Sequence, residues 1–142
     1  MDDILSANLQ IFWGAEGIKR TYEMSLKAKS LDIVCLSSDY QKVIGVYFDK
    51  DYAPRLFDSA TKTREILPDT AENRKDSTKK DGRKNQVKFL NLKNKSESDY
   101  MLFADKVILV SYNSQIPFAL VIEDKDIAEN LKAQFENLWQ RL

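Results

Sequence analysis

The side chains that most often perform catalysis are scarce in this chain of 142 residues, which contains no histidine and a single cysteine, Cys35. The absence of histidine excludes a serine–histidine–aspartate triad, a cysteine–histidine pair, an imidazole general base and imidazole ligation of a metal. The single cysteine excludes an intrachain disulfide and a zinc site made of several thiolates. Carboxylate and lysine chemistry remain, so the composition favours a protein that is not an enzyme and that holds no cofactor.

Two acidic runs, at residues 49–51 and 123–126, contain enough carboxylates to suggest Ca²⁺ or Mg²⁺. Neither run has the spacing of oxygen ligands in a calcium loop, so we interpret both as surface caps and predict no metal site. Cys35 lies within an apolar run, where a packed and inert thiol is the expected form.

Polar side chains follow three predicted strands where each strand ends, and one arginine lies within the third strand. In a wound sheet, ligands favour the crevice at the carboxyl ends of the strands, and this mixture of groups would suit a sugar or another polar metabolite. A structural role explains the same residues, because serine and aspartate cap helices and a tryptophan fills a core. The candidate ligand-binding residues are Trp13, Gly14, Ser37, Ser38, Asp39, Arg64 and Asp69.

Short β-rich runs and helical runs alternate along the chain and must position these residues. Their order, β-α-β-α-β-(α)-β-β-β-β-α, indicates a single α/β domain over residues 1–142, with an exposed polar segment at 71–85 that forms a short helix or a mobile loop. Pro54 predicts a break or a late start in the second helix. The predicted helices are 16–29, about 40–59 and 127–142, and the predicted strands are 9–13, 31–36, 61–67, 86–90, 100–103, 107–112 and 118–122.

The last predicted helix is the most regular element, and Asp124 or Asp126 would cap its first turn. Its apolar face is wide for a chain end, so a homodimer contact is one interpretation. Packing on the sheet is the interpretation that we favour, because an α/β sheet needs cover on both faces. The apolar face consists of Phe135, Leu138, Trp139 and Leu142.

Equal numbers of bases and acids, 22 of each, conceal an uneven distribution of charge. Residues 72–95 carry nine basic and three acidic side chains, a net charge of +6, so the rest of the chain carries −6. A general polyanion binder is usually basic as a whole, and no helix-turn-helix pattern surrounds this stretch. We therefore interpret 72–95 as a solvated, partly disordered loop and not as a DNA contact.

No stretch approaches the roughly 18 apolar residues of a membrane span, so we predict no membrane partner. The N-terminal sequence lacks the basic start and the long apolar run of a signal peptide. Together with the single reduced cysteine, this predicts a cytoplasmic location.

Five short segments occur in an order and spacing that resemble one known module: 12–19, 64–69, 87–90, 105–107 and 127–139. Together they resemble the phospholipase-D-like domain of TrmB-type transcriptional regulators of archaea and bacteria. The resemblance implies a phospholipase-D-like mixed sheet flanked by helices. It also implies a regulator whose domain receives a signal and passes it to a DNA-binding domain. In that family a winged helix-turn-helix precedes this domain, so DNA contact would require a winged-helix domain that is not present in this chain.

The same resemblance raises an enzymatic alternative, because phospholipase D chemistry uses a His-x-Lys-x4-Asp motif. Alignment of the turn at residues 105–107 puts the histidine position near Glu97 and the lysine position near Asp99. A carboxylate repels a phosphate and cannot form a phosphohistidine-type intermediate, so we predict a catalytically inert domain.

The sequence therefore predicts a non-catalytic sensor or oligomerisation domain of a TrmB-like regulator. Such a domain would form a homodimer and bind a small polar effector, a sugar or another metabolite, that changes the dimer geometry. Two alternatives remain open: a stand-alone interaction module without a small-molecule ligand, and a diverged hydrolase that uses carboxylates.

Overall fold

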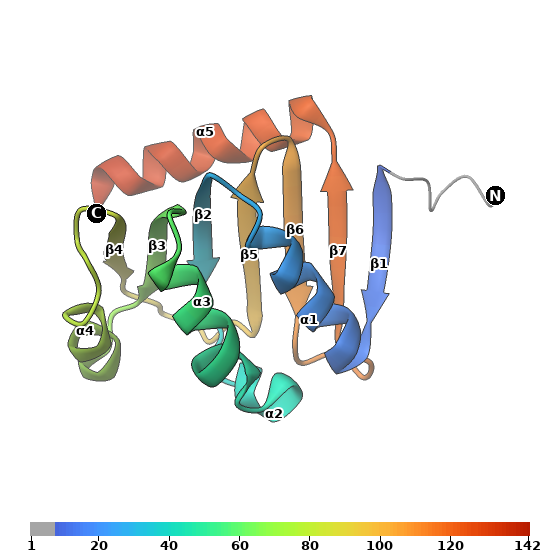
Figure 1. The fold of residues 1–142 in the computed structure, drawn as a ribbon, viewed down its shortest axis with the longest axis horizontal. Coiled ribbons are helices and arrows are strands. Elements are labelled where there is room, and N and C mark those ends of the chain that lie inside the picture. Colours follow the sequence, from blue (N-terminus) through green and yellow to red (C-terminus); the bar gives the residue numbers. More distant parts are fainter. Residues whose placement is uncertain (1–7) are drawn as a thin grey trace.

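The computed structural model of the protein describes residues 8–142 and centres on one mixed sheet of seven strands (Figure 1). The strand order is β1-β7-β6-β5-β2-β3-β4. Strands β2, β3 and β4 are parallel, and every other neighbouring pair is antiparallel. The strands are β1 (Leu9–Trp13), β2 (Ser30–Cys35), β3 (Lys62–Pro68), β4 (Asn85–Leu90), β5 (Ser98–Phe103), β6 (Lys106–Ser111) and β7 (Phe118–Glu123).

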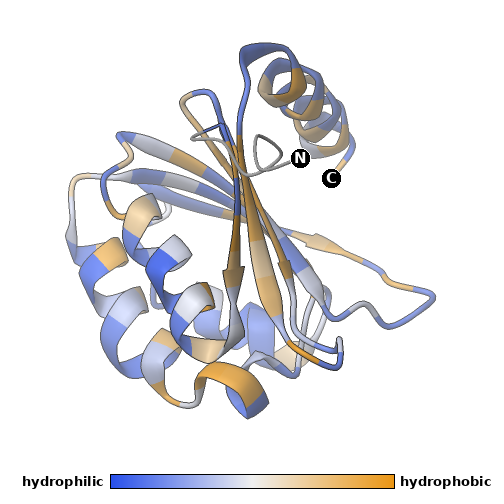
Figure 2. Ribbon diagram, turned by 90° about the vertical axis from the view of Figure 1, so that its right-hand side faces the viewer, coloured by the Kyte–Doolittle hydropathy of each residue, from blue (hydrophilic) through white to orange (hydrophobic). Residues whose placement is uncertain are grey.

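Helices lie on both faces of the sheet, and Figure 2 shows the last helix alone on one side. Successive strand residues point to opposite faces of the sheet. Ile33 packs in the core between the sheet and the helices of residues 14–58, and Val34 packs in the core between the sheet and the last helix. This arrangement confirms the predicted order of elements and the α/β class. The helices are α1 (Gly14–Ser25), α2 (Tyr40–Ile44), the π-helical turn η2 (Phe48–Tyr52), α3 (Ala53–Asp58), α4 (Ala71–Ser77) and α5 (Lys125–Arg141).

The segment predicted as one helix over 40–59 is divided into α2, η2 and α3. The first break falls at Gly45, whose φ of 58° ends α2 in a conformation that glycine adopts without strain. Pro54 lies in the first turn of α3, directly after the π-helical turn η2. Proline is common in the first turn of a helix, where its fixed φ suits the helical conformation. The predicted late start at Pro54 is therefore present, and Gly45 adds an earlier break that the sequence does not predict.

Helix α5 packs on the sheet, as the sequence predicts. Phe135 is fully buried and Trp139 is 7% exposed. Asp124 is the cap, since its carboxylate accepts a hydrogen bond of 2.9 Å from the backbone N–H of Ile127. These contacts leave little of the predicted apolar face for a homodimer.

The basic stretch is more ordered than the sequence predicts. The segment 71–85 begins with the short helix α4, which was one of its two predicted forms. The sequence predicts a solvated, partly disordered loop over 72–95. This prediction is wrong for Lys80 and Lys88, whose ammonium groups contact buried residues of the protein. Lys80 forms an ion pair of 2.6 Å with buried Glu65, and Lys88 donates to the carbonyl of Trp139 at 2.7 Å. Lys80 is held because Glu65 would otherwise be an unpaired buried carboxylate, which is costly.

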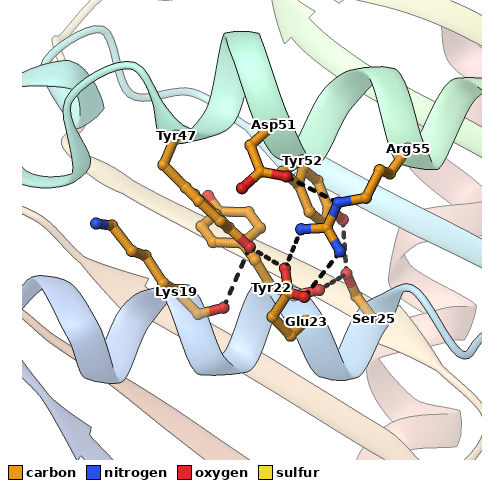
Figure 3. A network of polar contacts seen from close by, with 8 residues as sticks. All are labelled: Lys19, Tyr22, Glu23, Ser25, Tyr47, Asp51, Tyr52 and Arg55. Carbon is orange, nitrogen blue, oxygen red and sulfur yellow. Dashed lines mark hydrogen bonds and ion pairs between the residues drawn. The ribbon is translucent and has the colours of Figure 1, made fainter.

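A polar network fastens α1 to η2 and α3 (Figure 3). Arg55 donates to the two carboxylate oxygens of Glu23 at 2.9 and 2.5 Å and to Asp51 at 2.9 Å, and Tyr47 also donates to Glu23. The hydrogen bonds from Arg55 and then from Tyr47 lower the pKa of Glu23. The network therefore positions the helices that cover this face of the sheet.

Replacing Glu23 with glutamine should make the stability of the protein less sensitive to acid. Because the pKa of Glu23 is lower in the folded state, its contribution is present above the unfolded pKa of about 4.3 and is lost as the pH falls through the folded value. The contribution is below about 1 kcal/mol, since the side chain is 45% exposed. Urea unfolding at pH 7 and pH 3 measures it, with Glu129→Gln on exposed α5 surface as the control. An equal pH dependence in Glu23→Gln and Glu129→Gln would contradict this role.

Candidate functional site

Asp99 holds the end of β2 against the start of β5. It lies opposite Cys35 in the antiparallel pair and is 3% exposed. One carboxylate oxygen accepts the backbone N–H of Ser37 at 3.0 Å, and the other accepts the Ser37 hydroxyl at 2.7 Å and the Cys35 thiol at 3.4 Å. Three donors thus converge on one buried carboxylate at the carboxyl end of a central strand.

Burial governs the ionisation of both groups in this contact. Loss of solvation raises the pKa of Asp99, and the hydrogen bonds from Ser37 and Cys35 oppose the rise. Burial, and next the charge of Asp99, raise the pKa of the Cys35 thiol well above its ordinary value. The thiol therefore stays protonated and donates, which is the behaviour of an inert packed cysteine.

Glu97 holds the next two residues of the same loop. Its carboxylate accepts the backbone N–H groups of Ser38 and Asp39 at 3.2 and 2.9 Å, and the Ser38 hydroxyl at 3.1 Å. Lys95 joins the group, with its ammonium 3.1 Å from Asp39 and 3.3 Å from Glu97, and its hydrogen bond lowers the pKa of Asp39. We call Glu97, Asp99 and the loop 37–39 the acidic clasp.

The acidic clasp occupies the positions at which the sequence resemblance puts the histidine and lysine of the phospholipase D motif. Four residues separate the lysine and the aspartate of that motif, so the aspartate position is Ala104, whose φ is 51° in the turn before β6. All three positions therefore carry a residue that the motif does not have. Two of them bind the backbone of a neighbouring loop instead.

The predicted ligand-binding residues do not form one crevice. Ser37, Ser38 and Asp39 lie together in the acidic clasp. Asp69 follows β3 but is exposed and pairs with Arg74 at 2.6 Å. The structure thus brings three of the seven predicted residues into mutual proximity.

Trp13 and Gly14 end β1 at the same edge of the sheet, but β7, β6 and β5 lie between them and β2. Four strand spacings amount to about 19 Å. Trp13 is 57% exposed and contacts the ring of Phe118, and Gly14 forms a turn with a φ of 71° in which its N–H donates to Pro117 at 2.7 Å. These two residues are separate from the acidic clasp.

Arg64 lies on the face of the sheet that α5 covers and does not join the acidic clasp. It pairs with Asp32 at 2.9 Å and Glu136 of α5 at 2.7 Å, and its guanidinium lies 5.0 Å from the ring centre of Phe135. Successive side chains of a strand point to opposite faces, so the residue that reaches the other face is the next one, Glu65.

A cavity of about 710 Å³ lies beside the acidic clasp, over the ends of β2 and β3. Its walls come from η2 and α3 on one side and from α4 and the following turn on the other. Ser37 is the only predicted site residue in its lining. The residues that sequence reasoning missed include Tyr40, Phe48, Phe57, Glu65 and Lys80. The sequence does contain one indication of Glu65, because it is the one acidic residue within β3, and an acid in a strand of the sheet is a candidate for a functional site.

Within residues 8–142, no group of three or more acidic or cysteine side chains is arranged to hold a metal ion. Across the same residues, none of the helices has the length and apolar character required to cross a bilayer.

The sequence matches no protein-family model and no curated protein. Its structure is similar to the archaeal chromatin protein TrmBL2 (TM-score 0.63, 18% identity), covering 96% of this chain and 54% of that one. It is similar to NucT from Helicobacter pylori (TM-score 0.63, 18% identity), covering 93% and 95% of the two chains. It is also similar to Nuc, a phospholipase D family member from Salmonella typhimurium (TM-score 0.60, 12% identity), covering 93% of each.

These similarities establish the fold. The chain has the phospholipase-D-like fold, and the resemblance found in the sequence is confirmed at that level. The chain spans about half the length of TrmBL2. The neighbours include a chromatin protein and a member of the phospholipase D family, so the fold occurs in proteins of different kinds.

Proposed function

We propose that this chain is the non-catalytic sensor domain of a TrmB-like transcriptional regulator, and that a small polar effector binds in the cavity beside the acidic clasp. The main support for the proposal is that Ser37 belongs both to the acidic clasp and to the wall of the cavity. Its hydroxyl binds Asp99, and the same residue lines the cavity. A ligand in the cavity would therefore touch the loop that Glu97 and Asp99 bind, and these two residues are at the motif's histidine and lysine positions.

The absence of catalysis in this proposal follows from the chemistry of Glu97 and Asp99. Neither carboxylate can form the phosphohistidine-type intermediate of phospholipase D chemistry, and each is occupied by hydrogen bonds from the loop 37–39. Cys35 has a raised thiol pKa and does not supply a thiolate. Binding, and not bond cleavage, is the role that these groups support.

Signalling in this proposal works through differential binding. The cavity lies between η2 and α3 on one side and the α4–β4 segment on the other, so a ligand that prefers one spacing of these walls shifts the population toward it. A winged-helix domain elsewhere in a cytoplasmic regulator would convert that shift into a change of DNA affinity. The structural neighbour TrmBL2 is a DNA-binding protein, which favours this context.

A homodimer belongs to the same proposal, with its contact along β1. Strand β1 is at one edge of the sheet, and large apolar side chains are exposed around it: Ile11 is 37%, Trp13 57% and Ile116 58% exposed. Within residues 8–142 no strand pairs with the outer edge of β1, and exposed apolar side chains beside such an edge are typical of an interface. The molar mass in solution, measured for the protein and for Trp13→Ser, tests this contact.

Thermal unfolding in the presence of sugars, sugar phosphates, amino acids and amines tests the sensor function. At least one compound should raise the melting temperature by about 9 °C at a concentration near 100 times its Kd, because a ligand that binds only the folded state stabilises it by about 2.7 kcal/mol there. Stabilisation by none of them would favour a stand-alone interaction module.

A phosphodiesterase assay tests the absence of catalysis. With bis(p-nitrophenyl) phosphate and with single-stranded DNA, hydrolysis should stay at the level of buffer alone, with and without Mg²⁺. Metal-dependent hydrolysis that Asp69→Asn abolishes would identify a diverged carboxylate hydrolase and overturn the proposal.

A further inference from the structure

The walls of the cavity combine aromatic rings with carboxylates. Tyr40, Phe48 and Phe57 supply the rings from the segment that covers β2 and β3. Rings of Tyr40 and Phe48 lie 5.2 Å apart between centres, so they form one apolar surface. Aromatic faces attract cations through their quadrupole and shield the methylene groups of a flexible ligand from water.

The charge of the lining is negative. Five carboxylates and two ammonium groups line the cavity, a formal excess of three negative charges. An anion such as a sugar phosphate would meet repulsion there, whereas a cation would meet attraction. The five acids are Asp49, Asp58, Glu65, Asp76 and Asp81.

Three of these carboxylates have no cationic partner within residues 8–142. Asp49 accepts hydrogen bonds from the neutral groups of Tyr40 and Gln41. Asp81 accepts only a backbone N–H, and Asp58 forms no ion pair within the same described part of the chain. They remain available to a cation that enters the cavity.

Lys80 shows which chemical group the inner wall accepts. Its ammonium lies 2.6 Å from a carboxylate oxygen of Glu65 and 4.4 Å from the centre of the Phe57 ring. Glu65 is 3% exposed, so this carboxylate is almost entirely within the protein. A primary ammonium of the chain itself thus occupies a position made of a buried carboxylate and an aromatic face.

We propose that the cavity binds a small flexible organic amine with two or more primary or secondary ammonium groups, and that Lys80 competes with one of these groups for Glu65. This inference rests on the proposed sensor function and names the chemical class of its effector. One ammonium would displace Lys80 at Glu65 and Phe57, and another would reach Asp58 or Asp81 at the mouth. The displaced Lys80 lies in the turn after α4, so ligand binding would move the wall formed by that turn.

Isothermal titration calorimetry of the whole chain with spermidine and with putrescine, at low ionic strength, tests the proposal. Spermidine should bind saturably. The double variant Asp58→Asn/Asp81→Asn should weaken spermidine binding about tenfold, since two attractive charges are lost at the mouth. The control is Asp126→Asn/Glu129→Gln, which removes two exposed charges from α5 and should leave the Kd unchanged within about twofold.

The variant Lys80→Gln tests whether an ammonium group of the ligand binds at Glu65 or whether the ligand is attracted only by the net negative charge of the cavity. It removes the competing ammonium and leaves an amide to donate to Glu65, so spermidine should bind several times more tightly. Lys79→Gln removes the same charge from the neighbouring residue, keeps the ion pair of Lys80 with Glu65 and should change the Kd by less than about twofold. Equal effects of the two variants, or equal affinity of both double variants, would overturn the inference.

Glucose and glucose 6-phosphate are titrated in parallel to separate the two proposals. If either sugar compound binds and its affinity changes in the Asp58→Asn/Asp81→Asn variant while neither amine binds, the sensor function stands and the amine inference is wrong. If none of the four compounds binds and none of the wider panel stabilises the fold, both proposals are wrong.

Discussion

Replacing Asp99 with alanine should lower the free energy of unfolding by about 3 kcal/mol. The change removes the acceptor for the backbone N–H and hydroxyl of Ser37 and for the Cys35 thiol, and it leaves these donors unpaired in a buried place. Each unpaired buried donor costs about 1–3 kcal/mol, and a small cavity adds to the loss. Urea unfolding at pH 7 measures the effect.

Asp99→Asn is the matched comparison, because the amide oxygen still accepts the Ser37 N–H and the hydroxyl of Ser37 can reverse its direction. The loss for asparagine should be less than half of the loss for alanine. Glu129→Ala, on the exposed side of α5, should stay within about 0.5 kcal/mol of the parent protein. Similar losses in Asp99→Ala and Glu129→Ala would show that Asp99 does not hold the loop.

Replacing Phe135 with alanine should lower the free energy of unfolding by about 4 kcal/mol, which is within the range for large buried rings. Phe135 is fully buried, stacks on Trp139 with 5.8 Å between ring centres, and lies beneath the guanidinium of Arg64. Its loss leaves a cavity under α5 and removes the face on which Arg64 rests. Urea unfolding gives the size of the effect.

Leu142→Ala is the control for Phe135→Ala, since Leu142 belongs to the same predicted apolar face but is 38% exposed. It should cost less than about 0.5 kcal/mol. A loss below about 1.5 kcal/mol in Phe135→Ala would mean that α5 is not docked on the sheet as described.

The elements were predictable because their signals are local. The helical period of α5 and the cap at Asp124 can be read from neighbouring residues, and both are present in the structure. The division of the segment 40–59 was only partly predictable. Gly45 ends α2 through its backbone conformation, which depends on how the chain turns over the sheet and not on the period of its neighbours.

The site was less predictable, because it depends on which strands are neighbours. Nothing local shows that β5 lies next to β2, so the contact of Asp99 with Ser37 had no sequence signal. Trp13 was grouped with Ser37 because both follow a strand, but three strands separate β1 from β2. The prediction for Arg64 specifies its strand but not the face to which its side chain points, and in the structure Arg64 points toward α5.

The pairing of charged side chains also depends on which strands and loops are neighbours in the fold. The excess of +6 in residues 72–95 suggested a free basic loop, but Lys80 and Lys95 each pair with a carboxylate from a distant part of the sequence. The cavity next to them carries a negative lining in spite of its two lysines. The net charge of a sequence segment therefore does not predict the sign of the charge that lines the cavity.

The most direct test of the central claim is a titration of ¹⁵N-labelled protein with the compound panel, followed by heteronuclear NMR. The side-chain amides of Asn73 and Asn85 and the backbone amide of Ser37 report on the cavity, and the indole of Trp13 reports on the distant end of β1. At least one compound should shift the three cavity signals saturably and leave the Trp13 signal in place. Cavity signals that stay fixed with every compound, or shifts confined to Trp13, would contradict a sensor site beside the acidic clasp.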